Sequence, residues 1–580
     1  MLGERPAQRS LFDADHMYLD LVGEDTFYGF LAVHGRAIFR DEDYAGLYSP
    51  DWGRPSVPPS MLAIAMLLQS KDRAVDDEAK ARADFDLRWK VALGVPADAR
   101  PFAKSTLQKF RAQLVLKDQM RAVFLRSLEY ARQVGCLDER ELRVVLDTTY
   151  ILGQGAVKDT YNLLADCVRT LLRALAKTAD KPFPRYARAH GYTRYLAASI
   201  KGEADVNWGD ETARNEFLNG IVTDADRLLS LAEGTLASLD EGQAGRERIE
   251  RGVGLLRQLV SQDVQRDGES VALKDGVARD RVISVHDPDM RHGRKSRTRR
   301  FDGHKAAVAV DAESQLITAV DVLAGNAPDN EDALALVEAS EENTGLAVAE
   351  TIGDCAYGDG QTRQAFADAE RPLVAKVAAR GRSPQYSKDA FDIDLDEMSC
   401  TCPAGQTTRV LVRQGYWQDR CGARHPDRAF LFAAAACATC QLRSACVKGK
   451  GHKGRTVRLH PQEQLLREAR ALQESPAFQE YRRLRQTAEH RLARLVQLGI
   501  RKARYSGRRK TLFQLMMAAT VANLTLIARR TAPKQAGGRR ASSFFAFILD
   551  VKTTILHHLA HLNAGTVSLA AKTPAFRLGF

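Results

Sequence analysis

The sequence has few cysteines for its length, which excludes a fold held together by disulfide bonds. Nine cysteines occur in 580 residues, far fewer than in small secreted domains that depend on disulfides. The sequence also lacks an apolar stretch of the roughly 20 residues that a membrane-spanning helix needs. Its N-terminus, MLGERPAQRS, lacks the apolar segment of a signal peptide. We therefore expect a cytoplasmic protein with no membrane segment.

Strong compositional bias and internal repeats are also absent. Apolar residues make up 44% of the sequence and charged residues 27%, as in ordinary globular proteins. Such a chain is not disordered overall and can bury sizeable hydrophobic cores. Its length predicts roughly 3–4 domains.

The excess of positive charge is modest, but it is concentrated in two segments. The formal net charge is +12. Residues 481–510 contain eleven Lys or Arg and one acidic residue, and residues 291–305 contain seven and one. A single basic run is more often a solvated surface. Two runs that each adjoin a candidate catalytic segment favour a channel for phosphates.

The first 135 residues have helical periodicity. Apolar residues recur every three to four positions in MLAIAMLLQS and in DEAKARADFDLRWKVAL. Ser60 and Ser105 are placed to cap the helices that follow them. A capped helix with basic residues after a turn fits a helix-turn-helix that binds DNA, and it fits an ordinary helical bundle equally well.

Strands and helices alternate further along the chain, which predicts an α/β fold with mixed strands. An inserted helical domain is expected at 160–265, and helices at 462–530 with a break near 505–507. Residues 304–311 and 315–325 are expected to form a hairpin around the turn 312–314. The other expected strands are 143–150, 346–354 and 371–377, and the other expected helices are 329–340 and 358–369.

Three acidic residues stand in contexts that fit one another. Asp147 ends an apolar run in RVVLDTTY, Asp354 ends another in TIGDCAYGDG, and Glu489 lies in the basic helical segment. Taken singly, either Asp is more often a turn former or helix cap, and Glu489 is placed to pair with Arg485 on the same helix face. Two carboxylates at strand ends and one on a helix are together able to hold two divalent cations, which cut and rejoin phosphodiesters.

Six of the cysteines fall within 47 residues and suggest a metal site. They are Cys400, Cys402, Cys421, Cys437, Cys440 and Cys446. The CxxC of Cys437 and Cys440 suits tetrahedral Zn²⁺, with Cys446 as the third thiolate and Cys402 favoured over Cys400 as the fourth. Four thiolates would make the site structural. The alternative is a set of free thiols, and a redox CxxC lacks the βαβ context it needs.

These motifs resemble those of the DDE transposases of bacterial insertion sequences. LDTTY with Asp147 is similar to the first acidic motif of that family, and GDCAYGDG with Asp354 is similar to the second. RRLRQTAEHRLARLVQLGIRKARYSGRRK, in which Arg485 precedes Glu489 by four residues, is similar to the helix that bears the third acid. The resemblance spans most of residues 20–530.

Other segments support the resemblance, and two positions depart from it. FDGHKAAVAVD resembles the strand before the second motif, with His304 where Tyr is common, and LFQLMMAATVANLTLIARR with Asn523 resembles the closing helix. Val496 stands where many relatives carry Lys, and Tyr481 lies one residue further from Arg485 than in the commonest spacing.

The resemblance implies an RNase H-like mixed-sheet catalytic core with added parts. The segments expected are a helical DNA-binding domain (1–135), the first part of the core (140–155), a helical insertion (156–280), the continued core (281–384), a Cys-rich zinc-binding insertion (385–460), the core's C-terminal helices (461–530) and a tail (531–580).

The resemblance also implies a function. Asp147, Asp354 and Glu489 would ligate two Mg²⁺ ions, for which Mn²⁺ can substitute, and Zn²⁺ would be structural. The expected partners are double-stranded DNA, as terminal inverted repeats and target, and a second copy of the chain or a larger assembly. The residues expected to contact DNA are Lys305, Arg482, Arg485, Arg501, Lys502, Arg504, Arg508 and Lys510. An RNase H-like nuclease and a non-catalytic DNA-binding regulator derived from a transposase are the alternatives.

Overall fold

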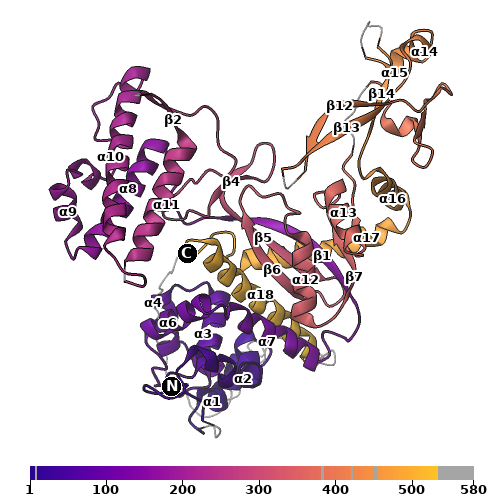
Figure 1. The fold of residues 1–580 in the computed structure, drawn as a ribbon. Coiled ribbons are helices and arrows are strands. Elements are labelled where there is room, and N and C mark those ends of the chain that lie inside the picture. Colours follow the sequence, from indigo (N-terminus) through magenta and orange to yellow (C-terminus); the bar gives the residue numbers. More distant parts are fainter. Residues whose placement is uncertain are drawn as a thin grey trace, which may run out of the picture. The chain divides into compact units, whose positions relative to one another are not determined.

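The computed structural model describes residues 1–6, 10–243, 245–268, 270–379, 384–419, 422–448 and 453–532. Residues Met1–Arg530 form one compact unit. Cys421 and nearly all of the tail lie outside the described residues, so the sequence predictions on them stay predictions. Figure 1 shows the fold.

The N-terminal part is helical, as predicted, although two predicted caps are wrong. The helix that Ser60 was expected to cap begins at Pro59, and the helix that Ser105 was expected to cap begins at Lys104, after Ala103. Both serines therefore lie inside the first turn of their helices. The elements are α1 (Ala14–Val22), α2 (Phe27–Ile38), the 3₁₀ helix η1 (Asp41–Leu47), α3 (Pro59–Asp72), α4 (Asp76–Phe85), α5 (Leu87–Leu93), α6 (Lys104–Leu116) and α7 (Met120–Gln133).

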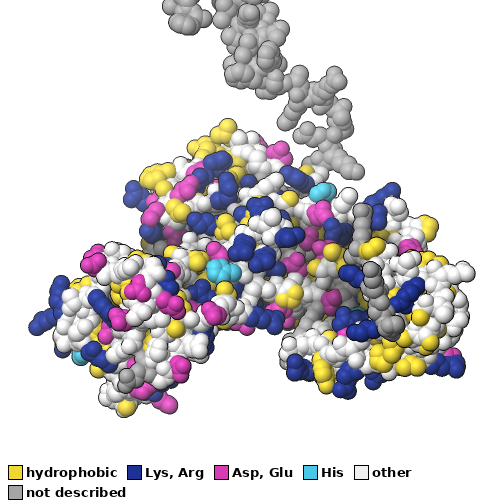
Figure 2. All heavy atoms as spheres, turned by 90° about the horizontal axis from the view of Figure 1, so that it is seen from above, with side chains coloured by type: hydrophobic (Ala, Val, Ile, Leu, Met, Phe, Trp, Pro, Cys, Tyr) yellow, Lys and Arg dark blue, Asp and Glu magenta, His cyan; other side chains and the backbone are white. Residues whose placement is uncertain are grey.

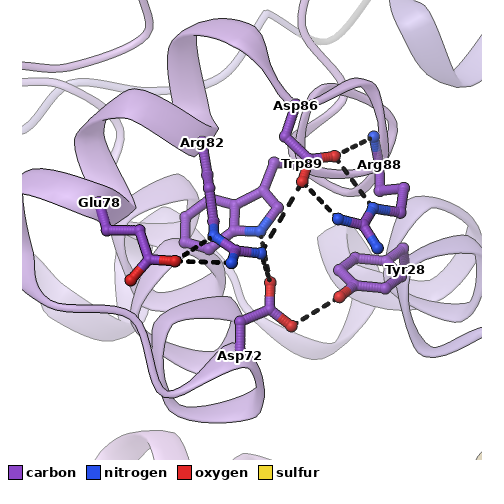
Figure 3. A network of polar contacts seen from close by, with 7 residues as sticks. All are labelled: Tyr28, Asp72, Glu78, Arg82, Asp86, Arg88 and Trp89. Carbon is purple, nitrogen blue, oxygen red and sulfur yellow. Dashed lines mark hydrogen bonds and ion pairs between the residues drawn. The ribbon is translucent and has the colours of Figure 1, made fainter.

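A polar network ties four of these helices together (Figure 3). Asp72, at the end of α3, accepts hydrogen bonds from the hydroxyl of Tyr28, the guanidinium of Arg82 and the indole N–H of Trp89. Trp89 is fully buried. Its N–H therefore depends on this carboxylate, because water cannot reach it.

A mixed sheet forms the centre of the protein, and the predicted hairpin of 304–311 and 315–325 is confirmed. The strand order is β6–β5–β1–β7–β8, and β4 also pairs with β5. β1, β7 and β8 are parallel, whereas β5 is antiparallel to β1, β4 and β6. The bounds are β1 (Leu142–Leu152), β4 (Arg291–Arg294), β5 (Arg300–Asp311), β6 (Ile317–Ala324), β7 (Val348–Gly353) and β8 (Leu373–Ala375).

Helices pack on this sheet because its central strands are apolar on both faces. Val144–Leu146 in β1 and Ala306–Val310 in β5 are all buried. α12 contacts β5, β6 and β7, while α17 contacts β1, β5 and β7. The bounds are α12 (Ala333–Thr344), α13 (Gly360–Asp368), α16 (Glu463–Glu474), α17 (Phe478–Gln497) and α18 (Arg508–Thr531).

Helix α18 is the described helix that is long and apolar enough to cross a membrane, a feature that the sequence prediction missed. Most of its apolar window is buried inside the protein, as in a core helix, so the match in length and composition is weak evidence for a span. The side chain of Asn523 in α18 accepts a hydrogen bond from the backbone N–H of Ile317 and donates one to its carbonyl. This pair fixes α18 to β6.

The predicted helical insertion has its own hydrophobic core, built from buried residues between Tyr161 and Val285. Gly155 lies against Ser284, where an added Cβ would come within 2.3 Å of the Ser284 hydroxyl, so the insertion leaves and rejoins the chain at one place. Its elements are α8 (Thr160–Thr178), α9 (Phe183–Ala189), η2 (Thr193–Leu196), α10 (Glu211–Ala237), α11 (Arg246–Asp263), β2 (Val264–Asp267) and β3 (Ser270–Leu273).

The cysteine-rich segment folds as short strands and turns around a small core that includes Phe391, Phe430 and Phe432. It contains two three-stranded sheets, β11–β10–β9 and β12–β13–β14. The elements are η3 (Lys388–Ala390), β9 (Asp392–Asp394), β10 (Ser399–Thr401), β11 (Thr407–Thr408), β12 (Leu411–Gln418), β13 (Arg424–Leu431), α14 (Ala434–Ala438), α15 (Arg443–Cys446) and β14 (Thr456–Leu459).

Candidate active site

Asp147 lies in the middle of the central strand, not at its end as predicted. β1 continues for five residues beyond it, and Asp147 pairs in register with Val308 of β5. The β-branched and aromatic residues Thr148, Thr149 and Tyr150 continue the strand because they suit a pleated, half-buried surface. The backbone N–H of Thr148 donates to Asp147 Oδ1 over 2.8 Å.

Asp354 directly follows β7, as predicted, and the sheet brings it next to Asp147. β7 runs parallel to β1 with Val145 opposite Ile352, so two further residues along each chain lead to the two aspartates. The backbone N–H of Ala356 donates to Asp354 Oδ1 over 2.8 Å. Gly353 makes this turn possible, because a Cβ there would come within 2.7 Å of the Cβ of the buried Tyr357.

Glu489 reaches the same place from α17, which packs on β1. Arg485, one turn earlier, forms an ion pair with Glu489, and its Nη1 lies 3.9 Å from Asp354 Oδ2. The i,i+4 pairing of Glu489 is thus confirmed. Arg485 also links α17 to the end of β7 through Asp354. Glu489 therefore pairs with Arg485 and at the same time lies near the two aspartates.

The three carboxylates lie within electrostatic reach of one another. Burial, followed by the negative charges of Asp354 and Glu489, raises the pKa of Asp147 to about 6, against the opposing effects of the Thr148 N–H and the Arg485 guanidinium. Burial, followed by the charges of Asp147, Asp329 and Asp354, raises the pKa of Tyr357 well above its ordinary value. Negative charge is therefore in excess here.

Such a donor set has the chemistry that divalent cations prefer. Carboxylate oxygens are the usual protein ligands of Mg²⁺, and one guanidinium leaves the three carboxylates with a net negative charge. Within the described ranges, no group of three or more His, Cys, Asp or Glu side chains is arranged as ligands round a common point. The three acids are neighbours, and their side chains would have to move closer together to ligate a common ion.

A pocket of about 320 Å³ opens beside Asp354, whereas Asp147 and Glu489 do not line it. Arg482 and Arg485 from α17 and Lys376 after β8 contribute positive charge to its wall. Tyr481 also lines it, but its hydroxyl donates to Glu350 over 2.8 Å and is engaged within the fold. The pocket thus sets one carboxylate, Asp354, beside a basic wall that suits a negatively charged group such as a phosphate.

The residues predicted to contact DNA divide into two groups. Lys305 is buried, forms an ion pair with Asp329 at 2.7 Å and donates to the carbonyl of Ala327. It therefore supports the turn after β6 rather than facing solvent. The side chains that are exposed are those of Arg482, Lys502, Arg508 and Lys510.

The remaining predicted cations bind groups of the fold. Arg501 donates to the Thr149 hydroxyl and the Tyr150 carbonyl, and Arg504 donates to the carbonyl of Ala74 in the helical N-terminal part. Figure 2 shows one face of the protein, over which Lys and Arg side chains are spread with Asp and Glu among them. Sequence reasoning missed that Lys295 and Arg299 join Arg501 around the ring of Tyr150. The basic run 291–305 was the available signal.

Four of the clustered cysteines meet in the cysteine-rich segment. Cys402, Cys437, Cys440 and Cys446 line one apolar pocket. Burial raises the pKa of the Cys446 thiol, and the other three thiols raise it further. Cys400 is fully buried in the small core and does not line that pocket. Cys402 thus lies with the other three thiols and Cys400 does not, and the four thiols are not arranged as ligands round a common point.

Comparison with protein families finds two matches. Residues 401–528 match a family described as "Transposase DDE domain", and residues 20–113 match one described as "Transposase domain (DUF772)". No curated protein and no solved structure matches the chain significantly. The first match includes Glu489 and Arg485, and the second covers most of the N-terminal helices, from α2 into α6.

Proposed function

We propose that this chain is a DDE transposase of the kind typical of insertion sequences, which its matches to two transposase domains support, and that it cuts DNA at the ends of its element and joins the freed 3′-hydroxyls to target DNA. The observation that carries the proposal is the convergence of Asp147, Asp354 and Glu489. These residues come from a central strand, a neighbouring strand end and a helix that lie more than 100 residues apart along the chain.

An RNase H-like core is part of the proposal. Three adjacent parallel strands, β1, β7 and β8, with the antiparallel β5 and β6 beyond β1, support it. The rigid sheet would hold the two aspartates in place, and α17 would bring Glu489 to them.

Asp147, Asp354 and Glu489 would hold the divalent metal ions, Mg²⁺ or Mn²⁺. Ions of this kind activate the attacking oxygen and stabilise the leaving oxygen of a phosphodiester. Arg485 balances part of the carboxylate charge in their absence. When DNA is bound, Arg485 and Arg482 in the wall of the adjacent pocket would contact phosphate oxygens near the scissile bond.

A Zn²⁺ ion would stabilise the cysteine-rich segment. Its ligands would be Cys402, Cys437, Cys440 and Cys446. The common pocket of these thiols and the small size of the surrounding core support this role, because small domains with little core often need a metal. We also propose that the active form contains at least two chains, since two element ends have to be paired before they are joined.

Cleavage of DNA that carries the sequences flanking this gene tests the proposal. We expect nicking or excision with Mg²⁺ or Mn²⁺ and none with EDTA. Asp147→Asn, Asp354→Asn and Glu489→Gln should each lower cleavage at least a hundredfold and leave DNA binding in a gel-shift assay unchanged. The matched control is Glu480→Gln on the same helix, because Glu480 pairs with Arg143 rather than with the cluster.

The outcomes separate the candidate functions. Cleavage followed by joining to a second DNA supports the transposase, whereas cleavage without joining indicates a nuclease. DNA binding with no cleavage under any metal indicates a regulator that lacks catalysis. Wild-type cleavage by any of the three carboxamide variants would remove that residue from the site.

A further inference from the structure

The hairpin that β4 and β5 form carries a dense group of cations that have no acidic partner among the described residues. Its tip, residues 294–300, is exposed and reads RKSRTRR. The turn is ordered by hydrogen bonds from the backbone N–H of Lys295 to the carbonyl of Arg299 and from the N–H of Arg299 to the Ser296 hydroxyl. Asp302, the acid nearest in sequence, is engaged by His292.

Two of these cations converge with a third from the other basic run on the ring of Tyr150. Arg501 Cζ lies 3.9 Å from the ring centroid, Arg299 Cζ 5.3 Å and Lys295 Nζ 5.5 Å. Arg299 also donates to the Tyr150 hydroxyl over 2.8 Å. We call Tyr150, Lys295, Arg299 and Arg501 the Tyr150 cluster.

The Tyr150 cluster has an uncompensated positive charge. Among the described residues, none of its three cations forms an ion pair with a carboxylate. Three like charges around one ring repel one another, and the negative face of the aromatic ring offsets this only in part. Side chains held in this way are positioned for an anion that none of the described carboxylates supplies.

The cluster lies at the end of β1 that follows Asp147. Tyr150 is three residues beyond Asp147 in the same strand, which corresponds to roughly 10 Å. Arg501 bonds both the Thr149 hydroxyl and the Tyr150 carbonyl, and residues 501–503 are hydrogen-bonded to Leu152. Side chains alternate along a strand, so Tyr150 faces away from Asp147, and Arg501 spans the edge between them.

We infer that the Tyr150 cluster and the β4–β5 hairpin form a second DNA contact, which grips backbone phosphates of the duplex about half a helical turn or less from the catalytic carboxylates. This inference rests on the proposed function and adds to it a surface and a binding mode. Arg and Lys that meet phosphates carry no base preference, so the contact is independent of DNA sequence. Its position would fix the duplex on the side of β1 opposite the pocket formed by α17.

Fluorescence anisotropy with a duplex of unrelated sequence tests this inference. We expect the double variant Lys295→Gln/Arg299→Gln to bind about tenfold more weakly at moderate salt. The slope of log affinity against log salt should become shallower by about 2, because each lost phosphate contact contributes roughly one unit. The matched control, Lys181→Gln/Arg185→Gln, removes the same charge from exposed positions at α9 and should bind like wild type.

A second pair of variants tests the ring. Tyr150→Phe keeps the aromatic face and should retain most of the affinity, whereas Tyr150→Leu should weaken binding several-fold. Thermal unfolding checks that each variant is folded. Wild-type affinity and salt slope in the Lys295→Gln/Arg299→Gln protein would overturn the inference, as would equal loss in the control.

The test separates this inference from the proposed function. If the wild-type protein cleaves DNA and the Lys295→Gln/Arg299→Gln variant binds DNA as tightly as wild type, the proposed transposase function stands and the second DNA contact is wrong. A wild-type protein that does not cleave, combined with the expected loss in the hairpin variant, would keep the contact and remove the catalytic proposal.

Discussion

At the scale of single residues, the surroundings of a carboxylate decide what it does. Asp72 accepts hydrogen bonds from three different side chains and holds them together. Asp147 has one N–H donor and two acidic neighbours. The first arrangement stabilises the fold, and the second is suited to binding a cation from outside.

Removing Asp72 should destabilise the protein strongly. Asp72→Ala leaves the buried indole N–H of Trp89 and a guanidinium without their acceptor, and we expect a loss of about 3 kcal/mol in the free energy of unfolding. Thermal or urea unfolding measures this. Glu78→Ala removes the exposed partner of Arg82 in the same network and should cost less than about 1 kcal/mol. Equal losses in the two variants would contradict this interpretation of the network.

Sequence alone predicted the three acids as candidate site residues but not the partners of residues such as Asp72. The pairing of Glu489 with Arg485 follows from helical spacing, so the sequence is sufficient to predict it. Tyr28 lies 44 residues from Asp72 in the sequence, and no local pattern links them. The burial of Lys305 behind Asp329 was missed for the same reason, because a lysine in a basic run gives no sign of its tertiary partner.

At the scale of elements, long periodic segments were predictable and short ones were not. The 304–311 and 315–325 hairpin, α13 and the break near Gly507 agree with their patterns, whereas α12 begins and ends four residues later than the predicted 329–340. β1 was predicted at 143–150, within two residues of its observed bounds Leu142–Leu152, but Asp147, which was predicted at a strand end, pairs with β5 in the middle of the strand. Strands β9, β10, β11 and β14, of two to four residues each, carry too few residues to show alternation.

The cysteine-rich element offers a test of its own. We expect purified protein to contain about one Zn²⁺ per chain, and the variant Cys437→Ser/Cys440→Ser to lose the metal and become less stable. Metal analysis and thermal unfolding measure the two effects. Cys355→Ser is the control, because Cys355 is exposed and outside this segment. A wild-type protein with no zinc after purification without chelators would leave these residues as free thiols.

At the scale of the whole molecule, the helical parts differ in how they are joined to the sheet. The N-terminal helices share one hydrophobic core with the sheet, in which Leu62 and Phe110 belong to the same cluster as Leu146 and Met517. The helical insertion instead surrounds a separate core. An element with its own core can fold alone, whereas one that shares a core exposes apolar surface when it is cut out.

This difference predicts that two helical fragments of similar length will behave differently. Residues 156–286, expressed alone, should be helical and unfold cooperatively, because their core is complete and their ends meet near Ser284. Residues 1–135 should show a lower melting temperature and a tendency to aggregate, because the fragment loses the sheet and α18 that cover its apolar side. Circular dichroism and light scattering measure both. A cooperative, soluble 1–135 fragment that melts at the higher temperature would show that the shared core contributes little to the N-terminal helices.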